Sequence, residues 1–371
     1  MPHRAGSALA IANPHAFGTG LHARTNLMHS SLPAGAPPPT VSIITPAYNA
    51  AGYIEHTLES AIRQTFPNFE LLIVDDGSMD ATSEIAERYA RNDRRIRVIR
   101  QANRGIAAAR NVALSLGRGR FFALLDSDDL WFPTYLAEQL AILERRPDIS
   151  ILSANALNFG GALDGEPLLS TVGPIRIVPL LRLVEVEDSL SILTVFRREV
   201  ADKIGTFDET LRRSEDYDFW LRAASAGFQI AVNPKPLGMY RRRPDSLSSD
   251  EALMLEAMRG PLSKVRRASL HRPDVQAAVD RQLARVERRG LVAKARHALL
   301  NGDMPALQSR FSALVMVTGA RRYRFARWLA GYSPATIRWA YSCKRMLVLI
   351  TKAGRRVAHS QMRTFWVGDR P

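Results

Sequence analysis

An apolar run that ends in a carboxylate cluster is the strongest feature of this sequence. Residues 121–125 are all apolar, and Asp126, Asp128 and Asp129 follow directly. Such a run predicts a fully buried strand of a parallel sheet. Because open α/β sheets bind ligands beyond the carboxyl ends of their strands, we expect a binding site here. Mg²⁺ or Mn²⁺ would relieve the mutual repulsion of these carboxylates, usually together with phosphate oxygens. The alternative is an acidic turn in solvent.

Strand-like and helix-like segments alternate through the first half of the chain. Strands are expected at 41–44, 69–74, 96–99 and 121–125, and helices at 54–62, 82–91 and 105–116. This alternation predicts βαβ units and an α/β fold with a mostly parallel sheet and flanking helices.

The pattern changes after residue 150. Strands are expected at 151–154, 189–196, 229–232 and 237–240, a loop at 160–173, and a helix at 217–226. Beyond residue 249 the composition is helical, with breaks at several prolines and a helical hairpin at 291–314 that turns at residues 301–303.

Composition and charge divide the chain into three parts. Residues 1–39 are rich in Ala, Gly, Pro and His without an apolar period, which indicates a disordered tail. Residues 40–249 form the α/β domain, and residues 250–371 form a basic, mainly helical region. Residues 258–371 contain 24 Lys and Arg against five acids, a net charge of +19, whereas the whole chain carries +15. A basic tail of this kind can contact nucleic acid, anionic lipid or an acidic polymer.

Cysteine content and hydropathy indicate the cellular compartment in which the protein is expected. Cys343 is the only cysteine, so no disulfide can form within the chain, which favours a reducing environment. The apolar runs 8–12 and 346–350 are too short for a secretory signal and a membrane span, respectively. We therefore expect a cytoplasmic protein, either free or peripheral at the inner face of the cell membrane.

Two further motifs carry polar side chains that could bind a ligand. Asp75-Asp76-Gly77-Ser78 follows a predicted strand, where an acid can accept from a nucleobase N–H or a ribose hydroxyl. An Asx turn with a helix cap explains the same residues. Arg110 lies on an Ala-rich helix and could reach a phosphate or an acid of the cluster, although a surface salt bridge is the commoner use of a lone arginine.

A second acidic group occurs at Ser214-Glu215-Asp216-Tyr217-Asp218, about where a helix begins. Acids at a helix N-terminus are stabilised by the helix dipole and can be simple capping residues. The functional interpretation is that one carboxylate is a general base that takes a proton from a hydroxyl. If one acidic group binds a metal and the other supplies a base, the two together are suited to a transferase that moves a group from a phosphate-activated donor to a hydroxyl.

The motifs together resemble the signature set of family 2 glycosyltransferases. The matching segments, in family order and spacing, are 41–49, 74–80, 125–129 and 215–216, and the resemblance spans residues 41–248. It implies a GT-A fold, a nucleoside-diphosphate sugar as donor, a divalent metal and inversion at the anomeric carbon, as in enzymes of bacterial surface polysaccharides.

The resemblance also implies roles for the donor-binding residues. Pro46 and Tyr48 would flank the nucleobase, and Asp76 would bind the edge of a uracil or thymine ring. Asp128 would contact the ribose or the sugar of the donor.

The resemblance also implies which residues bind the metal and which residue is the catalytic base. Asp129 would hold the metal that bridges the diphosphate, and Asp126 would belong to the same metal cluster. Asp216 matches the catalytic base, and Glu215 would contact the acceptor or support the base.

Two departures from the family pattern are visible. The family often has Tyr-Arg-x-His-x-x-Ser after the last strand, whereas residues 240–246 here have Arg243 in place of the His. Arginine does not ligate a metal, but Arg241 and Arg243 can clamp a diphosphate, and their segment is a candidate lid. The Gln-x-x-Arg-Trp motif of processive synthases is absent from the sequence, which favours single additions.

The basic tail has three interpretations. Residues 321–329 and 337–341 interleave cations with aromatic residues, which suits an anionic membrane where a lipid-linked acceptor is found. An ordinary helical region with a solvated basic face explains the tail equally well. Nucleic-acid binding is disfavoured because no known module is recognisable.

Two other functions remain open from the sequence. A non-catalytic nucleotide-sugar binder or scaffold of the same fold is the main alternative, but it has no need of a base at Asp216. A nucleotidyltransferase would need a Gly-rich loop after the first strand, and residues 45–52 contain a single glycine. We therefore expect a glycosyltransferase that acts on a glycan or lipid-linked acceptor.

Overall fold

The computed structural model describes residues 37–161, 163–186, 189–332 and 335. Of the predicted N-terminal tail, only residues 37–39 belong to this set. The aromatic and basic segment 337–341, Cys343 and the apolar run 346–350 also lie outside the described residues.

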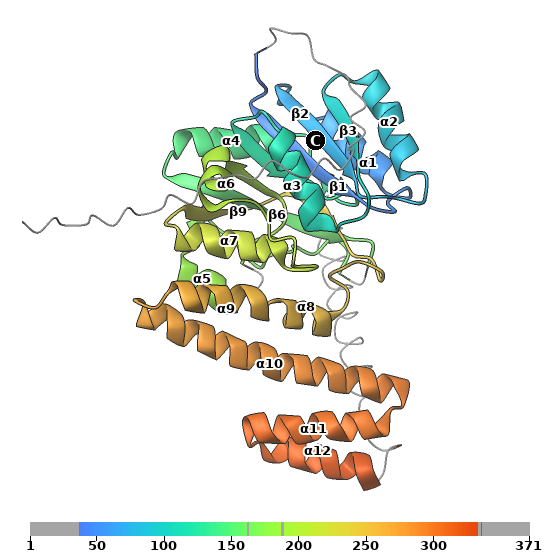
Figure 1. The fold of residues 1–371 in the computed structure, drawn as a ribbon, viewed down its shortest axis with the longest axis vertical. Coiled ribbons are helices and arrows are strands. Elements are labelled where there is room, and N and C mark those ends of the chain that lie inside the picture. Colours follow the sequence, from blue (N-terminus) through green and yellow to red (C-terminus); the bar gives the residue numbers. More distant parts are fainter. Residues whose placement is uncertain (1–36, 162, 187–188, 333–334, 336–371) are drawn as a thin grey trace, which may run out of the picture.

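A mixed sheet of nine strands, counted over the described residues, forms the core of the upper part of the molecule in Figure 1. The strands are β1 (Val41–Ala47), β2 (Phe69–Asp75), β3 (Ile96–Arg100), β4 (Phe121–Leu124), β5 (Leu130–Trp131), β6 (Ile149–Phe159), β7 (Arg176–Ile177), β8 (Thr194–Arg197) and β9 (Gln229–Arg241). Their order is β3-β2-β1-β4-β8-β6-β9-β5, and β7 pairs with β9. The first four strands are parallel, whereas β8 is antiparallel to both of its neighbours.

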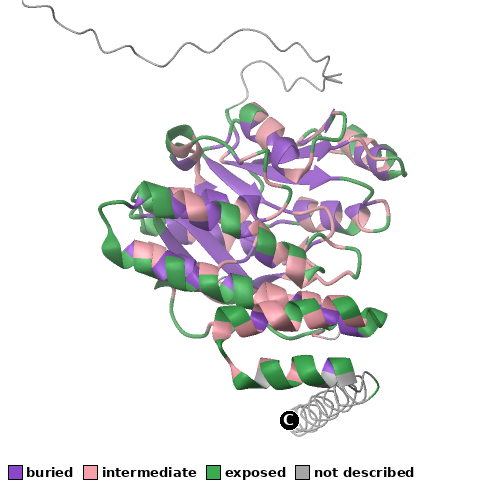
Figure 2. Ribbon diagram, turned by 60° about the horizontal axis from the view of Figure 1, so that its bottom comes forward, coloured by how far each residue is buried: buried purple, intermediate pink, exposed green. Residues whose placement is uncertain are grey.

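Helices cover both faces of the sheet. They are α1 (Ile54–Ile62), α2 (Thr82–Asn92), α3 (Ile106–Leu116), α4 (Tyr135–Arg145), α5 (Leu180–Glu185), α6 (Arg198–Ile204), α7 (Glu215–Ser225), α8 (Glu251–Ala257), α9 (Arg259–Ala268), α10 (Pro273–Asn301), α11 (Met304–Thr318) and α12 (Arg321–Tyr332). Alternate strand residues enter two hydrophobic clusters, as Ile44 and Ile43 of β1 show. Helices α1, α2 and α4 pack on one cluster, and α3 and α5 to α10 pack on the other. Figure 2 shows the buried residues concentrated in the sheet. The predicted α/β fold with flanking helices is confirmed.

Several predicted boundaries were wrong. The strand expected at 189–196 is only Thr194–Arg197, and the two strands expected at 229–232 and 237–240 are one strand, β9. Pro234 and Pro236 interrupt the amide donors of β9, where its register with β6 shifts, without ending the strand. The amphipathic helix α4 was not predicted, although its buried residues have helical spacing.

The C-terminal helices form two parts. Helices α8 to α10 share the hydrophobic cluster of α5 and α7, so they pack directly on the α/β core. Helices α11 and α12 contact the end of α10 through a small separate cluster that contains Leu299, Leu307 and Ala330. The predicted turn at 301–303 is confirmed, because α10 ends at Asn301 and α11 begins at Met304. Within the described part of the chain, the model contains no helix that combines the length and hydropathy of a membrane span.

Candidate active site

Parallel strand ends bring the first acidic motifs to one edge of the sheet. Strand β1 pairs with β2 on one side and with β4 on the other. Asp75 ends β2, and Asp126 follows β4 by two residues. The end of β1, with Pro46, therefore lies between the two acidic motifs.

The loop that follows β1 is held by the motif that follows β2. The backbone N–H of Asn49 donates to Ser78 Oγ at 3.0 Å, and the N–H of Met79 donates to Asn49 Oδ1 at 2.9 Å. Pro46 is buried at the strand end, whereas the ring of Tyr48 is 46% exposed. Tyr48 is thus open to a ligand from solvent, and its predicted contact with a nucleobase stays a prediction.

Asp76 organises the loop before α3. Its Oδ1 accepts from Gln101 Nε2 at 2.6 Å and from the backbone N–H of Arg104 at 2.9 Å, and its Oδ2 accepts from the N–H of Gly105 at 2.8 Å. Gly105 has φ +94° at the N-cap of α3. Asp76 is 4% exposed, so its first role here is to fix this loop, and base recognition by Asp76 stays a prediction.

The carboxylates after β4 form a mutually repelling group in which Asp129 is buried and Asp126 and Asp128 are partly buried. Asp129 Oδ1 accepts from the backbone N–H of Arg241 at 2.8 Å, whereas Asp129 Oδ2 is buried with no hydrogen-bond partner among the described residues. Burial, followed by the charges of Asp128 and Asp126, raises the pKa of Asp129 well above its usual range. Burial and Asp126 also raise the pKa of Asp128, against the opposing charge of Arg243, whose Nε lies 3.0 Å from Asp128 Oδ2.

This group fits a divalent cation. An unpartnered carboxylate oxygen beside a second carboxylate is the donor set that Mg²⁺ or Mn²⁺ prefers. The part of the chain that the structure describes has no group of three His, Cys, Asp or Glu side chains arranged as a closed metal cage. Such a cage is not required, because Mg²⁺ in nucleotide sites is usually held by one or two carboxylates together with phosphate oxygens.

Arg110 joins the two acidic groups of the sequence. Its guanidinium lies 2.7 Å from Asp126 Oδ1 and 2.5 Å from Glu215 Oε1, although Glu215 is 105 residues away in the chain. Burial disfavours its charge, but Asp126 and Glu215 outweigh this effect and raise the pKa of Arg110. At 1% exposure Arg110 is not the surface salt bridge that the sequence left open, and it binds an acid of the cluster instead.

The first turn of α7 carries the second acidic group. The helix begins at Glu215 rather than at the predicted residue 217, and Ser214 before it has the left-handed φ of +60°. Burial raises the pKa of Glu215 to about 7 against the attraction of Arg110. Burial also raises the pKa of Asp216, and the backbone N–H of Tyr217 donates to Asp216 Oδ1 at 2.7 Å. Buried carboxyls with raised pKa values are typical of functional sites.

Two aromatic residues that the sequence analysis missed support the arginines after β9. The guanidinium of Arg241 lies 4.2 Å from the ring centroid of Phe159 and 4.9 Å from that of Tyr53. The guanidinium of Arg243 lies 4.7 Å from the same Tyr53 ring. Arg241 Nε also donates to the backbone carbonyl of Asp128 at 2.8 Å. No sequence signal distinguishes Tyr53 or Phe159 from ordinary half-buried aromatic residues.

Comparison with known proteins agrees with this geometry. The family described as Glycosyl transferase family 2 matches residues 42–205. TuaG of Bacillus subtilis, a glycosyltransferase assigned by name to teichuronic acid biosynthesis, is 34% identical over 224 residues, which are 57% of this chain and 83% of TuaG. TarS 1-349 of S. aureus, solved in complex with UDP-GlcNAc, has a TM-score of 0.57 at 25% identity, over 81% of this chain and 89% of TarS 1-349.

A more distant likeness concerns the fold alone. The mannosyltransferase PcManGT from Pyrobaculum calidifontis, in complex with GDP-Man and Mn²⁺, has a TM-score of 0.53 at 19% identity, over 81% of this chain and 87% of PcManGT. The family match ends at residue 205, so Glu215, Asp216, Arg241 and Arg243 lie beyond the matched segment. Because the aligned segment covers more than four fifths of TuaG at 34% identity, and the fold agrees, this chain belongs to glycosyltransferase family 2 and is a glycosyltransferase of the GT-A fold.

Proposed function

We propose that this glycosyltransferase moves a sugar, with inversion, from a nucleoside-diphosphate sugar to a hydroxyl of a glycan or lipid-linked acceptor. The observation that carries the proposal is the Arg110 bridge, because it joins the candidate metal ligand Asp126 to Glu215, next to the candidate base Asp216. The acceptor hydroxyl attacks the anomeric carbon while the diphosphate leaves, so the metal ligands and the base must lie within one site.

The donor side follows from the buried carboxylates and the arginines. Asp129, through its unpartnered Oδ2, and Asp126 would hold Mg²⁺ or Mn²⁺, and Asp128 would contact the ribose or the sugar of the donor. A bound divalent cation supplies a Lewis acid that neutralises the departing diphosphate. Arg241 and Arg243 would bind diphosphate oxygens from the segment after β9.

The acceptor side uses the first turn of α7. Asp216 takes the proton of the acceptor hydroxyl while that oxygen forms a bond to the anomeric carbon and the bond from this carbon to the diphosphate oxygen breaks. Attack from the face opposite the leaving group inverts the anomeric configuration. Arg110 keeps Glu215 in place beside the base, and the helix N-terminus favours the negative charge of both acids.

The names of the similar proteins support the substrate class. TuaG is assigned to teichuronic acid biosynthesis, and TarS was solved with UDP-GlcNAc. We therefore propose a nucleotide-sugar donor and a role in the assembly of a bacterial surface polysaccharide. The cytoplasm, with access to the inner face of the cell membrane, is the compartment in which such donors and lipid-linked acceptors meet.

Donor binding is tested by the melting temperature of the protein with UDP, dTDP or GDP, each with and without Mn²⁺. A ligand that binds only the native state stabilises it by about 2.7 kcal/mol at 100 times its Kd, a shift of several degrees. We expect one diphosphate to give a shift that needs the metal. No shift with any diphosphate would favour a non-catalytic scaffold.

The base is tested by Asp216→Asn, with the exposed Asp202→Asn as the matched control. We expect Asp216→Asn to keep the diphosphate-induced shift and to lose sugar transfer by about 100-fold or more, the usual contribution of a general base. Transfer is measured as diphosphate release with a panel of glycan acceptors. Near wild-type transfer by Asp216→Asn would refute the assignment.

A further inference from the structure

Helix α12 exposes large aromatic residues together with arginines on one face. Arg324 and Phe325 each lie three or four residues from Arg321 and from Trp328, so the four residues share one side of the helix, and all four are exposed. We call them the outer face. Phe325 is 62% exposed and Trp328 is 56% exposed, and their rings stack with centroids 5.7 Å apart. The opposite side of the helix carries Ala330, which is 1% exposed and packs against α11.

This arrangement departs from an ordinary surface helix. A surface helix normally turns its largest apolar side chains to the core and its charges to solvent. Among the α12 residues whose side chains the structure describes, Ala330 is buried, whereas Phe325 and Trp328 are exposed next to arginines. Contiguous exposed aromatic residues with a charged rim mark an interaction surface.

The charges of α12 are also unlike those of the preceding helices. Cations of α9 and α10 pair with acids, as in Arg266–Asp280 at 2.7 Å and Lys294–Glu256 at 2.7 Å. Residues 304–332, which form α11 and α12, contain five arginines and no acidic residue. Arg310, Arg321, Arg324 and Arg327 form no ion pair with other described residues. Acids of neighbouring helices therefore neutralise part of the positive charge of α9 and α10, whereas the hairpin of α11 and α12 keeps its positive charge.

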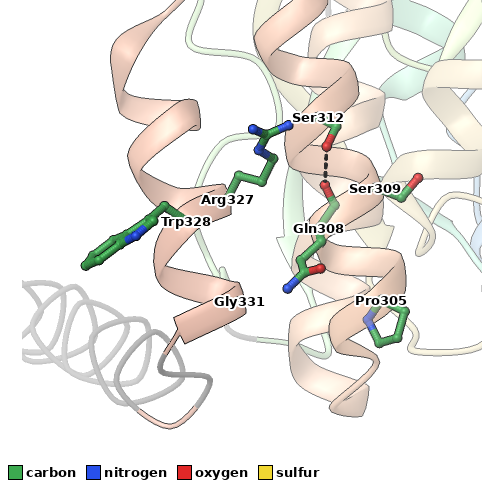
Figure 3. A pocket seen from close by; sticks show the side chains of 7 residues that line it. All are labelled: Pro305, Gln308, Ser309, Ser312, Arg327, Trp328 and Gly331. Carbon is green, nitrogen blue, oxygen red and sulfur yellow. Dashed lines mark hydrogen bonds between the residues drawn. The ribbon is translucent and has the colours of Figure 1, made fainter.

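A shallow, open hollow of about 650 Å³ lies between the two helices of the hairpin. It is lined by Pro305, Gln308, Ser309, Ser312, Arg327, Trp328 and Gly331. Figure 3 shows Arg327 directed toward α11 and Trp328 pointing away from it. The hollow thus offers an arginine with amide and hydroxyl groups beside the exposed aromatic pair, a combination that suits a phosphate-bearing headgroup.

We propose that the outer face of α12 docks on an anionic lipid bilayer. Phe325 and Trp328 enter the headgroup region, Arg321 and Arg324 contact lipid phosphates, and Arg327 in the hollow receives one headgroup. The apolar rings of aromatic residues insert favourably between lipid headgroups, and arginines are attracted by the negative surface potential of the bilayer. The proposal deepens the proposed function, since it gives the enzyme a place next to a lipid-linked acceptor.

Vesicle binding tests the proposal without any transfer reaction. The full chain is sedimented with phosphatidylcholine vesicles and with vesicles that also contain phosphatidylglycerol, at low and high salt. We expect binding to the anionic vesicles only, weakened by salt. Each arginine near an anionic surface contributes a factor of about five to binding, so Arg321→Gln with Arg324→Gln should weaken it about 25-fold. Phe325→Ser with Trp328→Ser should weaken it about tenfold or more.

Matched variants control for charge and for apolar area. Arg91→Gln with Arg145→Gln removes two exposed arginines from α2 and α4, and Leu270→Ser removes an apolar side chain that is 70% exposed in the turn before α10. Both controls should bind anionic vesicles as the wild type does. The melting temperature of each variant, with and without diphosphate and Mn²⁺, reports folding and donor binding separately from vesicle binding.

Three results would overturn the proposal. The first is equal binding of the wild type to neutral and anionic vesicles. The second is wild-type vesicle binding by the outer-face variants. The third is tighter binding of the outer face to an RNA or DNA oligonucleotide than to anionic vesicles, which would assign the surface to nucleic acid. A failure of vesicle binding with a preserved diphosphate shift would leave the proposed transferase function standing.

Discussion

Replacement of Arg110 by methionine should uncouple the two acidic groups of the site. Methionine has a similar length and fills most of the space, so the change removes chiefly the charge and its hydrogen bonds. In the native protein the guanidinium lies 2.7 Å from Asp126 and 2.5 Å from Glu215. The Arg110→Met variant leaves both carboxylates in place without their shared cation.

The size of the effect follows from burial. Loss of one partner of a buried ion pair costs about 3–5 kcal/mol of the free energy of unfolding, because a charge stays buried without compensation. The side chain of Glu215 is 7% exposed, but that of Asp126 is 24% exposed and can be partly solvated. We therefore expect the lower end of the range, a loss of about 3 kcal/mol.

The loss should also depend on pH. Burial already raises the pKa of Glu215 to about 7, and without the attraction of Arg110 this pKa rises further. A carboxyl group whose pKa is higher in the folded than in the unfolded state stabilises the folded protein fully at pH values below its unfolded pKa. This contribution is lost as the pH rises through the folded pKa. The cost of Arg110→Met should therefore be smaller at pH 5, where Glu215 takes up a proton, than at pH 8.

Urea unfolding at pH 5 and pH 8 measures both quantities, and Arg104→Met is a matched control. Arg104 precedes the same helix and pairs with Glu209, also 105 residues away, at 2.7 Å, but the two side chains are 54% and 40% exposed. An exposed pair contributes about 0–1 kcal/mol. If Arg110→Met costs no more than Arg104→Met, or if its cost is the same at both pH values, the buried bridge does not hold the site together.

Two other interactions give separate predictions. Tyr53→Ala should weaken diphosphate binding in the presence of Mn²⁺ about fivefold, since each cation–π contact with Arg241 and Arg243 is worth roughly 0.5–1 kcal/mol. Calorimetric titration with the diphosphate and Mn²⁺ measures this affinity, and Tyr53→Phe should have the affinity of the wild type. An equal loss of affinity in both variants would rule out the ring contact. Partial burial tends to raise the pKa of Asp208, but hydrogen bonding from Lys264 outweighs it and the pKa is about 2. The pairing of Asp208 with Lys264 stabilises the folded protein above pH ~4, and this stabilisation is lost as the pH falls through the folded pKa. On acidification, the free energy of unfolding of Lys264→Met should therefore decrease by about 1 kcal/mol less than that of the wild type.

Local patterns were sufficient for the fold class and for the order of the motifs. The alternation of apolar strands with amphipathic helices predicted the parallel strands β1 to β4, because hydrophobic periodicity is set by neighbours in the chain. Boundaries were less secure after residue 150. Strand β9 continues through Pro234 and Pro236 because pairing with β6 on both sides of the register shift holds it.

Residue partnerships across the chain could not be predicted in the same way. The sequence suggested that Arg110 could reach a phosphate, an acid of the cluster or solvent. Only the folded chain, which brings Asp126 and Glu215 to the guanidinium of Arg110, decides for these two acids. The acids at 75–76 are a similar case. Asp75 Oδ1 accepts from the N–H of Ser78 at 3.0 Å within its own loop, whereas Asp76 fixes residues 101–105.

The sequence by itself determined the family of this protein, because carboxylates and glycines at fixed places after strands need only local backbone geometry and the order of the strands. The tertiary structure decided which charges meet. Tyr53 and Phe159 become supports for Arg241 only when α1, β6 and β9 come together. The physical reason is that burial, which raises the pKa of Glu215, and contact between residues far apart in the chain are properties of the packed molecule and leave no local pattern in the sequence.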